Sequence, residues 1–390
     1  MKNKLNIISC SRADYGLLKK LIFLFRNDRF FETKLVITGS HFSKLHGNSI
    51  NEIKKDKIKI DKKIPIKVFD GNENSISNSI STIISEYSKY LLSNKPKLVI
   101  ILGDRYEILA IAIACLINRI PLAHIHGGEI TYGAIDDAIR HSLTKLSNLH
   151  FVANKVYKKR VIQLGESKNY IFNYGGLGVD AIQNLKLINK TTLEKLLKFK
   201  FWHYNFIVTY HPVTYEKNQS AKQFNEILKS IRACRNIFFI FTFPNTDQEN
   251  NEIINKILNF CKNNVNTTYY RNLGQLNFLS LLKECDGIIG NSSSGLLEAP
   301  TLNVGTINIG NRQNGRLRSS SVIDVRAKKE DIIKAIKNIL SKKFKNRIKS
   351  SNNPYGNGGS SLKIYKKIKE ILKNKDLLSV KNFKDIAFKF

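Results

Sequence analysis

Short apolar runs rich in β-branched residues recur along this 390-residue chain, and polar or amphipathic stretches separate them. Residues 98–102 (LVIIL) and 237–243 (IFFIFTF) are apolar at nearly every position. Such continuous runs are typical of strands that are buried on both faces of a parallel sheet. Helical patterns lie between them, for example at 14–27, 76–92 and 221–233. The alternation predicts repeated βα units and therefore an α/β fold.

The predicted strands fall into two sets, separated by a glycine-rich stretch at 175–178. The first set is 5–10, 34–38, 98–102, 122–125, 151–153 and 170–173, and the second is 206–210, 237–243, 267–270, 287–290, 305–309 and 322–325. We therefore expect two Rossmann-like, doubly wound domains, over residues 1–180 and 181–365.

The C-terminal residues have an amphipathic pattern at 362–372 and again at 383–390, after a turn-rich loop at 352–361. Apolar residues recur there three and four positions apart, which is the spacing of one helix face. We expect residues 366–390 to form a helical segment that can pack back on the first domain.

Positive charge is in large excess, because 64 Lys and Arg residues oppose 31 Asp and Glu residues and leave a net charge of +33. The basic residues are spread along the chain, and their clusters do not alternate with aromatic residues that could stack on bases. We therefore expect no nucleic-acid partner. The charge does favour a small anionic substrate.

The chain has features of a protein of the cytoplasm. Its longest apolar run, 108–117, is shorter than the roughly 20 residues of a membrane-spanning helix. The N-terminal apolar stretch is brief and charge follows it at once, unlike a secretory signal. Five cysteines lie far apart with no CxxC pair, which is typical of reduced thiols and not of a zinc site. We expect a cytoplasmic protein that does not bind membranes.

Polar side chains follow two predicted strands of the first half, at the edge where ligands of open parallel sheets bind. Arg12 stands where the first strand gives way to a helix, and its guanidinium could bind a phosphate through two hydrogen bonds. The segment also fits a plain helix start, with Ser11 as its N-cap and Asp14 complementing the helix dipole, and both interpretations can hold together. Asp104, after the strand at 98–102, is likewise either a helix cap or a site residue.

Two histidines end another predicted strand. His124 and His126 are two positions apart, so their side chains would point to one face and could bind a metal ion. No clear third ligand accompanies them, and we predict no metal site. The glycines at 127 and 128 would let the backbone approach a ligand closely.

A predicted helix carries Asp136, Asp137 and Arg140. Asp136 and Arg140 are four positions apart and share a helix face, where an exposed ion pair would contribute little. A buried acid beside a cation would instead have a shifted pKa and could transfer protons. Taken alone, this spacing favours the exposed ion pair.

Polar residues also follow the strands of the second half. His211 could donate to a phosphate or protonate a leaving group, although a lone histidine is more often structural. Asn245 and Arg271 follow the next two strands, and Arg312 follows the strand at 305–309. Their position beyond the carboxyl ends of parallel strands makes these three residues candidates for a ligand site.

The most specific local pattern is GNSSSGLLEAP at 290–300, where a strand, a turn of small residues and a helix start occur in that order. The amide N–H groups and hydroxyls of Ser292 and Ser293 could bind a phosphate at the helix start. Glu298, about one turn further, could accept both hydroxyls of a ribose. N-capping needs only one of the serines.

Six motifs occur in register: SRADYG, GDRYE, HIHGGEITYGAIDDAIRHS, HPVT, GNSSSGLLEAP and INIGNRQNGR. Together they resemble the UDP-N-acetylglucosamine 2-epimerase family, and SRADYG, IDDAIRH and GNRQ most resemble its hydrolysing branch, which feeds sialic-acid-type sugar synthesis. The resemblance covers residues 4–365. It implies a GT-B fold, with two Rossmann-like domains facing across a cleft that holds the nucleotide sugar. It also implies a dimer or tetramer and no metal or nicotinamide cofactor.

The resemblance implies a reaction as well. UDP-N-acetylglucosamine would lose UDP by elimination across C1–C2, giving 2-acetamidoglucal, and water would then add to yield N-acetylmannosamine. The implied roles are acid–base chemistry for Asp104, Asp136 and Asp137, their orientation for Arg140, diphosphate contact for His211, phosphate binding for Ser292 and Ser293, ribose binding for Glu298, and closure on the ligand for Arg12 and Arg312.

This chain departs from the family at one position. Many members read HIEGGE where this chain has HIHGGE, so His126 stands where others carry a proposed catalytic glutamate. Either His126 transfers the proton, or Glu129 substitutes, or the substrate differs. The last alternative would be UDP-N,N'-diacetylbacillosamine, in the legionaminic acid pathway. A GT-B glycosyltransferase shares the nucleotide cleft and is the other enzyme class that we consider.

Overall fold

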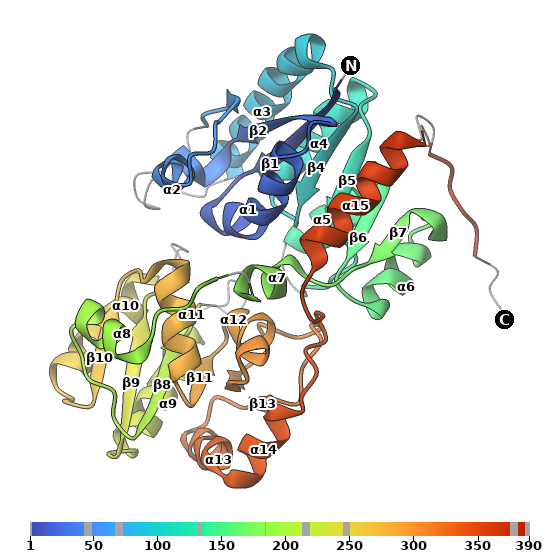
Figure 1. The fold of residues 1–390 in the computed structure, drawn as a ribbon. Coiled ribbons are helices and arrows are strands. Elements are labelled where there is room, and N and C mark those ends of the chain that lie inside the picture. Colours follow the sequence, from blue (N-terminus) through green and yellow to red (C-terminus); the bar gives the residue numbers. More distant parts are fainter. Residues whose placement is uncertain are drawn as a thin grey trace. The chain divides into compact units, whose positions relative to one another are not determined.

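The structure is a computed structural model that describes residues 2–42, 49–66, 73–131, 135–183, 185–212, 219–244, 250–374 and 381–386. The chain forms two compact units (Figure 1). Unit 1 consists of Met1–Ile130, Ala134–Ala181 and Gly358–Phe390, and unit 2 consists of Ile182–Asn357 together with Thr131–Gly133. The C-terminal residues therefore belong to the same unit as the N-terminus.

Unit 1 is built on a parallel sheet with the order β3-β2-β1-β4-β5-β6-β7. Its strands are β1 (Asn3–Ser9), β2 (Phe31–Ile37), β3 (Lys62–Lys63), β4 (Leu98–Leu102), β5 (Leu122–Ile125), β6 (Leu149–Val152) and β7 (Ile171–Asn173). The chain runs outward from β1 in one direction and then, from β4, in the other. The carboxyl ends of β1 and β4 therefore flank the point at which ligands bind in doubly wound sheets.

Helices cover both faces of this sheet (Figure 1). They are α1 (Arg12–Arg26), α2 (Ile50–Lys55), α3 (Glu73–Asn94), α4 (Tyr106–Ile117), α5 (Ile135–Leu146), α6 (Lys155–Gln163), α7 (Leu177–Gln183) and α15 (Ser360–Lys373). In β4, Leu98 and Ile100 pack in the core shared with α1 and α15, whereas Val99 and Ile101 pack in the core shared with α3 and α4. Because both faces are buried, the strand has no polar alternation.

Unit 2 repeats this architecture in a parallel sheet with the order β10-β9-β8-β11-β12-β13. Its strands are β8 (Tyr204–Thr209), β9 (Ile237–Thr242), β10 (Thr267–Tyr270), β11 (Gly287–Gly290), β12 (Gly305–Ile309) and β13 (Val322–Val325). Its helices are α8 (Lys190–Leu197), α9 (Ser220–Arg232), α10 (Asn250–Lys262), α11 (Gly274–Glu284), α12 (Ser294–Leu297), α13 (Lys329–Leu340) and α14 (Lys342–Lys349). The switch point lies between β8 and β11.

The predicted α/β class with two doubly wound parallel sheets is confirmed. Several strands, such as those at 98–102 and 267–270, have the predicted bounds. The short strand β3 was not predicted, because its two residues are both lysines. None of the helices in the described ranges is long and apolar enough to span a membrane.

The predicted helix at 383–390 is wrong over the residues that the structure describes, because 381–386 are not helical. The backbone N–H of Lys384 donates to the carbonyl of Gly165 at 2.9 Å, so this segment satisfies a backbone group against unit 1 and not within a helix turn. Residues 387–390 lie outside the described residues.

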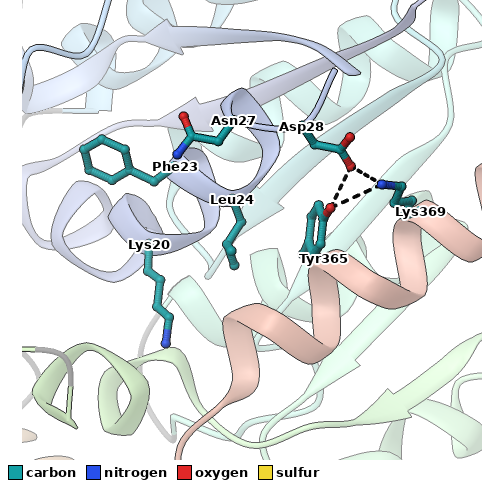
Figure 2. Close-up of a pocket in the computed structure, with 7 residues that line it drawn as sticks. All are labelled: Lys20, Phe23, Leu24, Asn27, Asp28, Tyr365 and Lys369. Carbon is teal, nitrogen blue, oxygen red and sulfur yellow. Dashed lines mark hydrogen bonds and ion pairs between the residues drawn. The ribbon is translucent and has the colours of Figure 1, made fainter. Parts of the chain in front are cut away.

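Helix α15 packs against α1 and fixes the C-terminal part of the chain to unit 1. At one end of the contact, Asp28 accepts a hydrogen bond of 2.6 Å from the Tyr365 hydroxyl and lies 2.5 Å from Nζ of Lys369 (Figure 2). A hollow of about 390 Å³ lies between the two helices. Tyr365 and Lys369 of α15 line one side of it, and Lys20, Phe23 and other residues of α1 line the other.

Candidate active-site residues in the two units

A buried arginine gathers the acidic candidates of unit 1. Arg140 lies in α5 and is 1% exposed. Its guanidinium pairs with the carboxylate of Asp104, which follows β4, and donates to Oδ1 of Asp137 at 3.2 Å. It also donates to the backbone carbonyl of Glu129 at 3.0 Å. Polar groups from around residues 104, 129 and 137 therefore meet at one guanidinium, which can bind several acceptors at once.

Asp136 opens α5 beside this cluster and is half-buried. Burial raises the pKa of Asp136, and the negative charge of Asp104 raises it further. A carboxyl group in this state can take or give a proton nearer to neutral pH than an exposed one. Arg105 and Arg140 lower the pKa and oppose this shift, so the environment of Asp136 is that of a partly buried acid beside a like charge.

Both ring nitrogens of His126 lie close to polar groups. Its Nε2 accepts the backbone N–H of Leu177 at 3.1 Å, and its Nδ1 lies 3.2 Å from Oε1 of Glu129. Because Nε2 is an acceptor, the neutral ring carries its proton on Nδ1, facing the glutamate. The residue has φ of 69°, a left-handed conformation that is uncommon outside glycine. The imidazole therefore lies beside Glu129, which is 6% exposed, and is itself hydrogen-bonded to the start of α7.

His124 has different partners from His126. Its Nε2 lies 2.8 Å from the carbonyl of Gly103 and its Nδ1 lies 3.4 Å from Oγ1 of Thr144. Burial lowers the pKa of His124 to about 3, so the ring is neutral at physiological pH. Within the described residues, no group of three or more His, Cys, Asp or Glu side chains is arranged to hold a metal ion.

Arg12 begins α1 at the carboxyl end of β1. Its Nε donates to Oε1 of Glu52 in α2 at 3.0 Å, and both side chains are partly exposed. Ser11 is the N-cap and accepts the backbone N–H of Asp14 at 3.2 Å, as one of the two alternatives predicted. Burial raises the pKa of Asp14 to about 6.

Sequence reasoning gave no role to two residues of the GDRYE motif. Glu107 is fully buried, and Arg105 donates to its two carboxylate oxygens at 2.7 and 3.0 Å. Paired charges two residues apart at the start of α4 were the available signal. The pair fixes the turn that follows Asp104.

In unit 2, Asn291 connects the ends of three strands. Its side chain accepts the backbone N–H of His211 at 2.7 Å and donates to the His211 carbonyl at 2.7 Å. Its own carbonyl accepts from Arg312 at 3.0 Å and from Gln313 at 2.8 Å. Sequence reasoning missed Asn291 and Gln313. An amide side chain directly after a strand, able to donate and accept, was the signal for the first.

His211 is 6% exposed at the end of β8. Burial lowers the pKa of His211 to about 3, and the nearby charge of Arg312 lowers it further. A neutral imidazole can donate one hydrogen bond to a phosphate oxygen, but it is not an imidazolium acid at neutral pH.

Ser292 and Ser293 form the turn between β11 and the short helix α12. The turn begins at Gly290, whose φ is 138° and where any Cβ would collide with the carbonyl of Thr209. Glycine therefore allows β11 to end close against β8, next to His211.

Glu298 follows α12 and has an unused acceptor. Its Oε2 is buried and has no hydrogen-bond partner among the described residues. Burial raises the pKa of Glu298, while Ser294 and Arg316 oppose that shift. Buried acceptors are rarely left without a donor, so this oxygen is suited to a ligand hydroxyl.

The two remaining candidates of unit 2 are less informative. Arg271 is exposed and follows β10, at the edge of the sheet. Asn245 lies outside the described residues. The structure thus brings Asp104, Asp137, Arg140 and the Glu129 segment together in unit 1, and His211, Asn291 and Arg312 together in unit 2.

Comparison with known proteins gives consistent matches. The family model for "UDP-N-acetylglucosamine 2-epimerase" matches residues 24–369. The chain is 42% identical to a Campylobacter jejuni protein named GDP/UDP-N,N'-diacetylbacillosamine 2-epimerase (hydrolyzing), over 99% of this chain and 100% of that one. It is 38% identical to polysialic acid biosynthesis protein P7 of Escherichia coli, over 98% and 96%.

Among solved structures, the UDP-GlcNAc 2-epimerase of Neisseria meningitidis, bound to UDP-GlcNAc, matches with a TM-score of 0.74 at 20% identity. The match covers 95% of this chain and 100% of that one. The likeness shows a fold of the GT-B type.

Proposed function

Because this chain belongs to the UDP-N-acetylglucosamine 2-epimerase family and is a UDP-sugar 2-epimerase, we propose that it is a hydrolysing member that acts on a UDP-2-acetamido sugar. In the first step the C2–H bond breaks, its electron pair forms the C1=C2 double bond, and UDP leaves with the C1–O electrons. Water then adds its oxygen to C1, and a proton returns to C2 on the opposite face. The products are the free 2-epimeric sugar and UDP.

The observation that carries the proposal is the cluster around Arg140 in unit 1. Removal of a weakly acidic C2 proton requires a positioned carboxylate, and a second acid must return a proton. Asp136 has a raised pKa, and Asp104 and Asp137 are held by one buried guanidinium. We assign the proton transfers to Asp136 and Asp104, with Arg140 and Asp137 orienting them.

His126, which stands where many family members carry a glutamate, also lies beside a carboxylate. His126 has both ring nitrogens engaged within unit 1, and one of them faces Glu129. We propose that Glu129 supplies the carboxylate at this position and that His126 orients it. Conversion of Glu129 to glutamine should therefore cost more activity than conversion of His126 to asparagine.

In unit 2 the residues suit a nucleoside diphosphate. The leaving diphosphate gains charge, so donors must be aimed at it. We propose that His211, Ser292 and Ser293 donate to the phosphates and that Arg312 and Arg271 contribute positive charge. Arg12 of unit 1 remains a candidate ligand from its sequence position. The partnerless oxygen of Glu298 would accept from the ribose. Asn245 remains a candidate ligand from its sequence position.

The sequence favoured UDP-N-acetylglucosamine as the substrate and N-acetylmannosamine as the product. The similarity to the Campylobacter jejuni protein, at 42% identity over nearly the whole chain, favours N,N'-diacetylbacillosamine as the sugar. We therefore place UDP-N,N'-diacetylbacillosamine first and UDP-N-acetylglucosamine second. The name of that relative includes GDP, so the GDP-linked sugar belongs in the same test.

The test is to incubate the purified protein with each of the three nucleotide sugars and follow the products by NMR. The proposal predicts release of the nucleoside diphosphate together with a free sugar of inverted C2 configuration from at least one of them. Reversible interconversion of a nucleotide sugar and its C2 epimer, without release of the diphosphate, would refute the hydrolysing assignment. A requirement for an acceptor sugar would support a glycosyltransferase instead.

A further inference from the structure

A lysine from the C-terminal segment closes the end of the helix that carries the acidic cluster. Nζ of Lys381 lies 3.0 Å from the carbonyl oxygen of Thr144, 2.5 Å from that of Lys145 and 2.7 Å from that of Ser147. These carbonyls belong to the last turn of α5 and the residue after it. An ammonium group there satisfies carbonyls that a helix end leaves exposed and complements the negative end of the helix dipole.

The same ammonium is fixed by a buried carboxylate. Oε2 of Glu166 lies 2.8 Å from Nζ of Lys381 and 3.1 Å from Nε2 of His150, and Oε1 accepts from Lys145 at 2.7 Å. Glu166 and His150 are nearly completely buried. Burial disfavours the Glu166 carboxylate, but these donors outweigh it and hold its pKa at about 2. Lys381 thus occupies a fixed site and is not a solvated surface charge.

Two further residues of the segment contact unit 1 at this site. The ring of Phe383 lies over Gly165, where any Cβ would collide with it, and Nζ of Lys145 lies 4.9 Å from the ring centroid. The backbone N–H of Lys384 donates to the Gly165 carbonyl at 2.9 Å. The side chain of Lys384, by contrast, is exposed.

Thr144 joins this helix end to the acidic cluster one turn away. Its hydroxyl donates to the carbonyl of Arg140 at 3.1 Å and lies 3.4 Å from Nδ1 of His124. Arg140 pairs with Asp104, and Nε2 of His124 lies 2.8 Å from the carbonyl of Gly103, the residue before Asp104. One hydrogen-bonded route therefore leads from Thr144, whose carbonyl Lys381 binds, through Arg140 to Asp104, and the ring of His124 packs beside it against Gly103.

We propose that Lys381 is a positioning residue for the acid–base group of unit 1, because it fixes the helix that presents Asp136, Asp137 and Arg140. The effect on catalysis rests on the proposed function, in which those side chains act on the sugar. The C-terminal segment contributes no reacting group and would influence the chemical step through α5. Small displacements of reacting groups are costly, and about 1 Å can reduce a rate about 100-fold.

The experiment compares K381M, which removes the ammonium, with K381R, which keeps a cationic donor. K384M is the matched control, because it removes one exposed charge from the same segment. For K381M we expect kcat to fall about 10- to 100-fold with KM changed less than about twofold. We expect K381R to recover most of kcat and K384M to match the wild-type protein. Unchanged kcat in K381M, or a kcat for K381R no higher than that for K381M, would overturn the proposal.

Amide hydrogen exchange provides a readout that does not depend on turnover. For K381M we expect exchange at residues 140–146 to become about tenfold faster, with no change for K384M. Unchanged protection of α5 in K381M would contradict the proposal. If the wild-type protein converts none of the nucleotide sugars, the proposed function fails, whereas the exchange comparison still decides whether Lys381 fixes α5.

Thr144→Val tests whether the coupling runs through the Thr144 hydroxyl, and it replaces K381M as the test if that variant does not fold. The substitution replaces a hydroxyl by a methyl group of similar size, so we expect kcat to fall by at least about fivefold while KM stays unchanged. In the double variant T144V/K381M, the fold-loss in kcat should be smaller than the product of the losses in the two single variants, because both substitutions interrupt one network. A full product of the two losses, or no loss in T144V, would contradict the route through Thr144.

Discussion

Glu298→Gln separates the contribution of this residue to folding from its contribution to binding. In the free protein, Oε2 of Glu298 is buried with no hydrogen-bond partner among the described residues, and burial raises the pKa of the carboxyl group. Its folded pKa lies above its unfolded pKa, so the folded state binds more protons and loses stability as pH rises above the ordinary value of about 4.5. A neutral amide removes that penalty. We therefore expect the free variant to be as stable as the wild type, or more stable by about 1 kcal/mol.

The same substitution should weaken nucleotide binding. A hydrogen bond to a charged acceptor contributes about 1.5–3 kcal/mol, which corresponds to about a 10- to 100-fold change in Kd. Titration calorimetry with UDP should show this loss, while 2',3'-dideoxy-UDP, which has no ribose hydroxyls, should bind the wild type and variant alike. Glu330→Gln, at an exposed position of unit 2, is the matched control and should change neither value. An equal loss for both nucleotides, or no loss for UDP, would refute the ribose assignment.

Four other substitutions test separate parts of the account. Arg140→Met should destabilise the protein by about 2–3 kcal/mol in urea unfolding, because it leaves two paired carboxylates without their cation, and it should abolish turnover. Asp104→Asn should abolish turnover while calorimetry still detects UDP binding. Asn291→Ala should weaken UDP binding and cost about 2–3 kcal/mol of stability, because it unties the ends of β8, β11 and β12. Glu166→Gln should remove roughly 3 kcal/mol that the wild type has above pH 5 and loses as pH falls toward 2, as measured by unfolding across that range.

The strands could be predicted from sequence because burial on both faces leaves a continuous apolar run. Residues 98–102 show this plainly, since alternate side chains enter two different cores. The structure of two regions could not be predicted in this way. The lysines of β3 carry no apolar signal. Residues 383–386 belong to the stretch predicted as a helix, but the segment at 381–386 makes its contacts with Gly165 and the end of α5. Tertiary hydrogen bonds overrode the local pattern there.

The candidate site could be predicted as far as it depends on position after a strand. Asp104, His126 and His211 all follow strands and were singled out for that reason. Their partners could not be predicted, because they come from elsewhere in the chain. Leu177, whose amide fixes the His126 ring, is 51 residues away, and Asn291 is 80 residues from His211. The catalytic and binding roles themselves remain predictions.

The measurement that tests the central claim most directly is the reaction in D2O, followed by NMR of the released sugar. If a carboxylate removes the C2 proton and solvent supplies its replacement, the product carries deuterium at C2, and the nucleoside diphosphate accumulates in equal amount. A product that retains the original C2 proton would show that no elimination across C1–C2 takes place, and the assignment of Asp104 and Asp136 to proton transfer would be wrong.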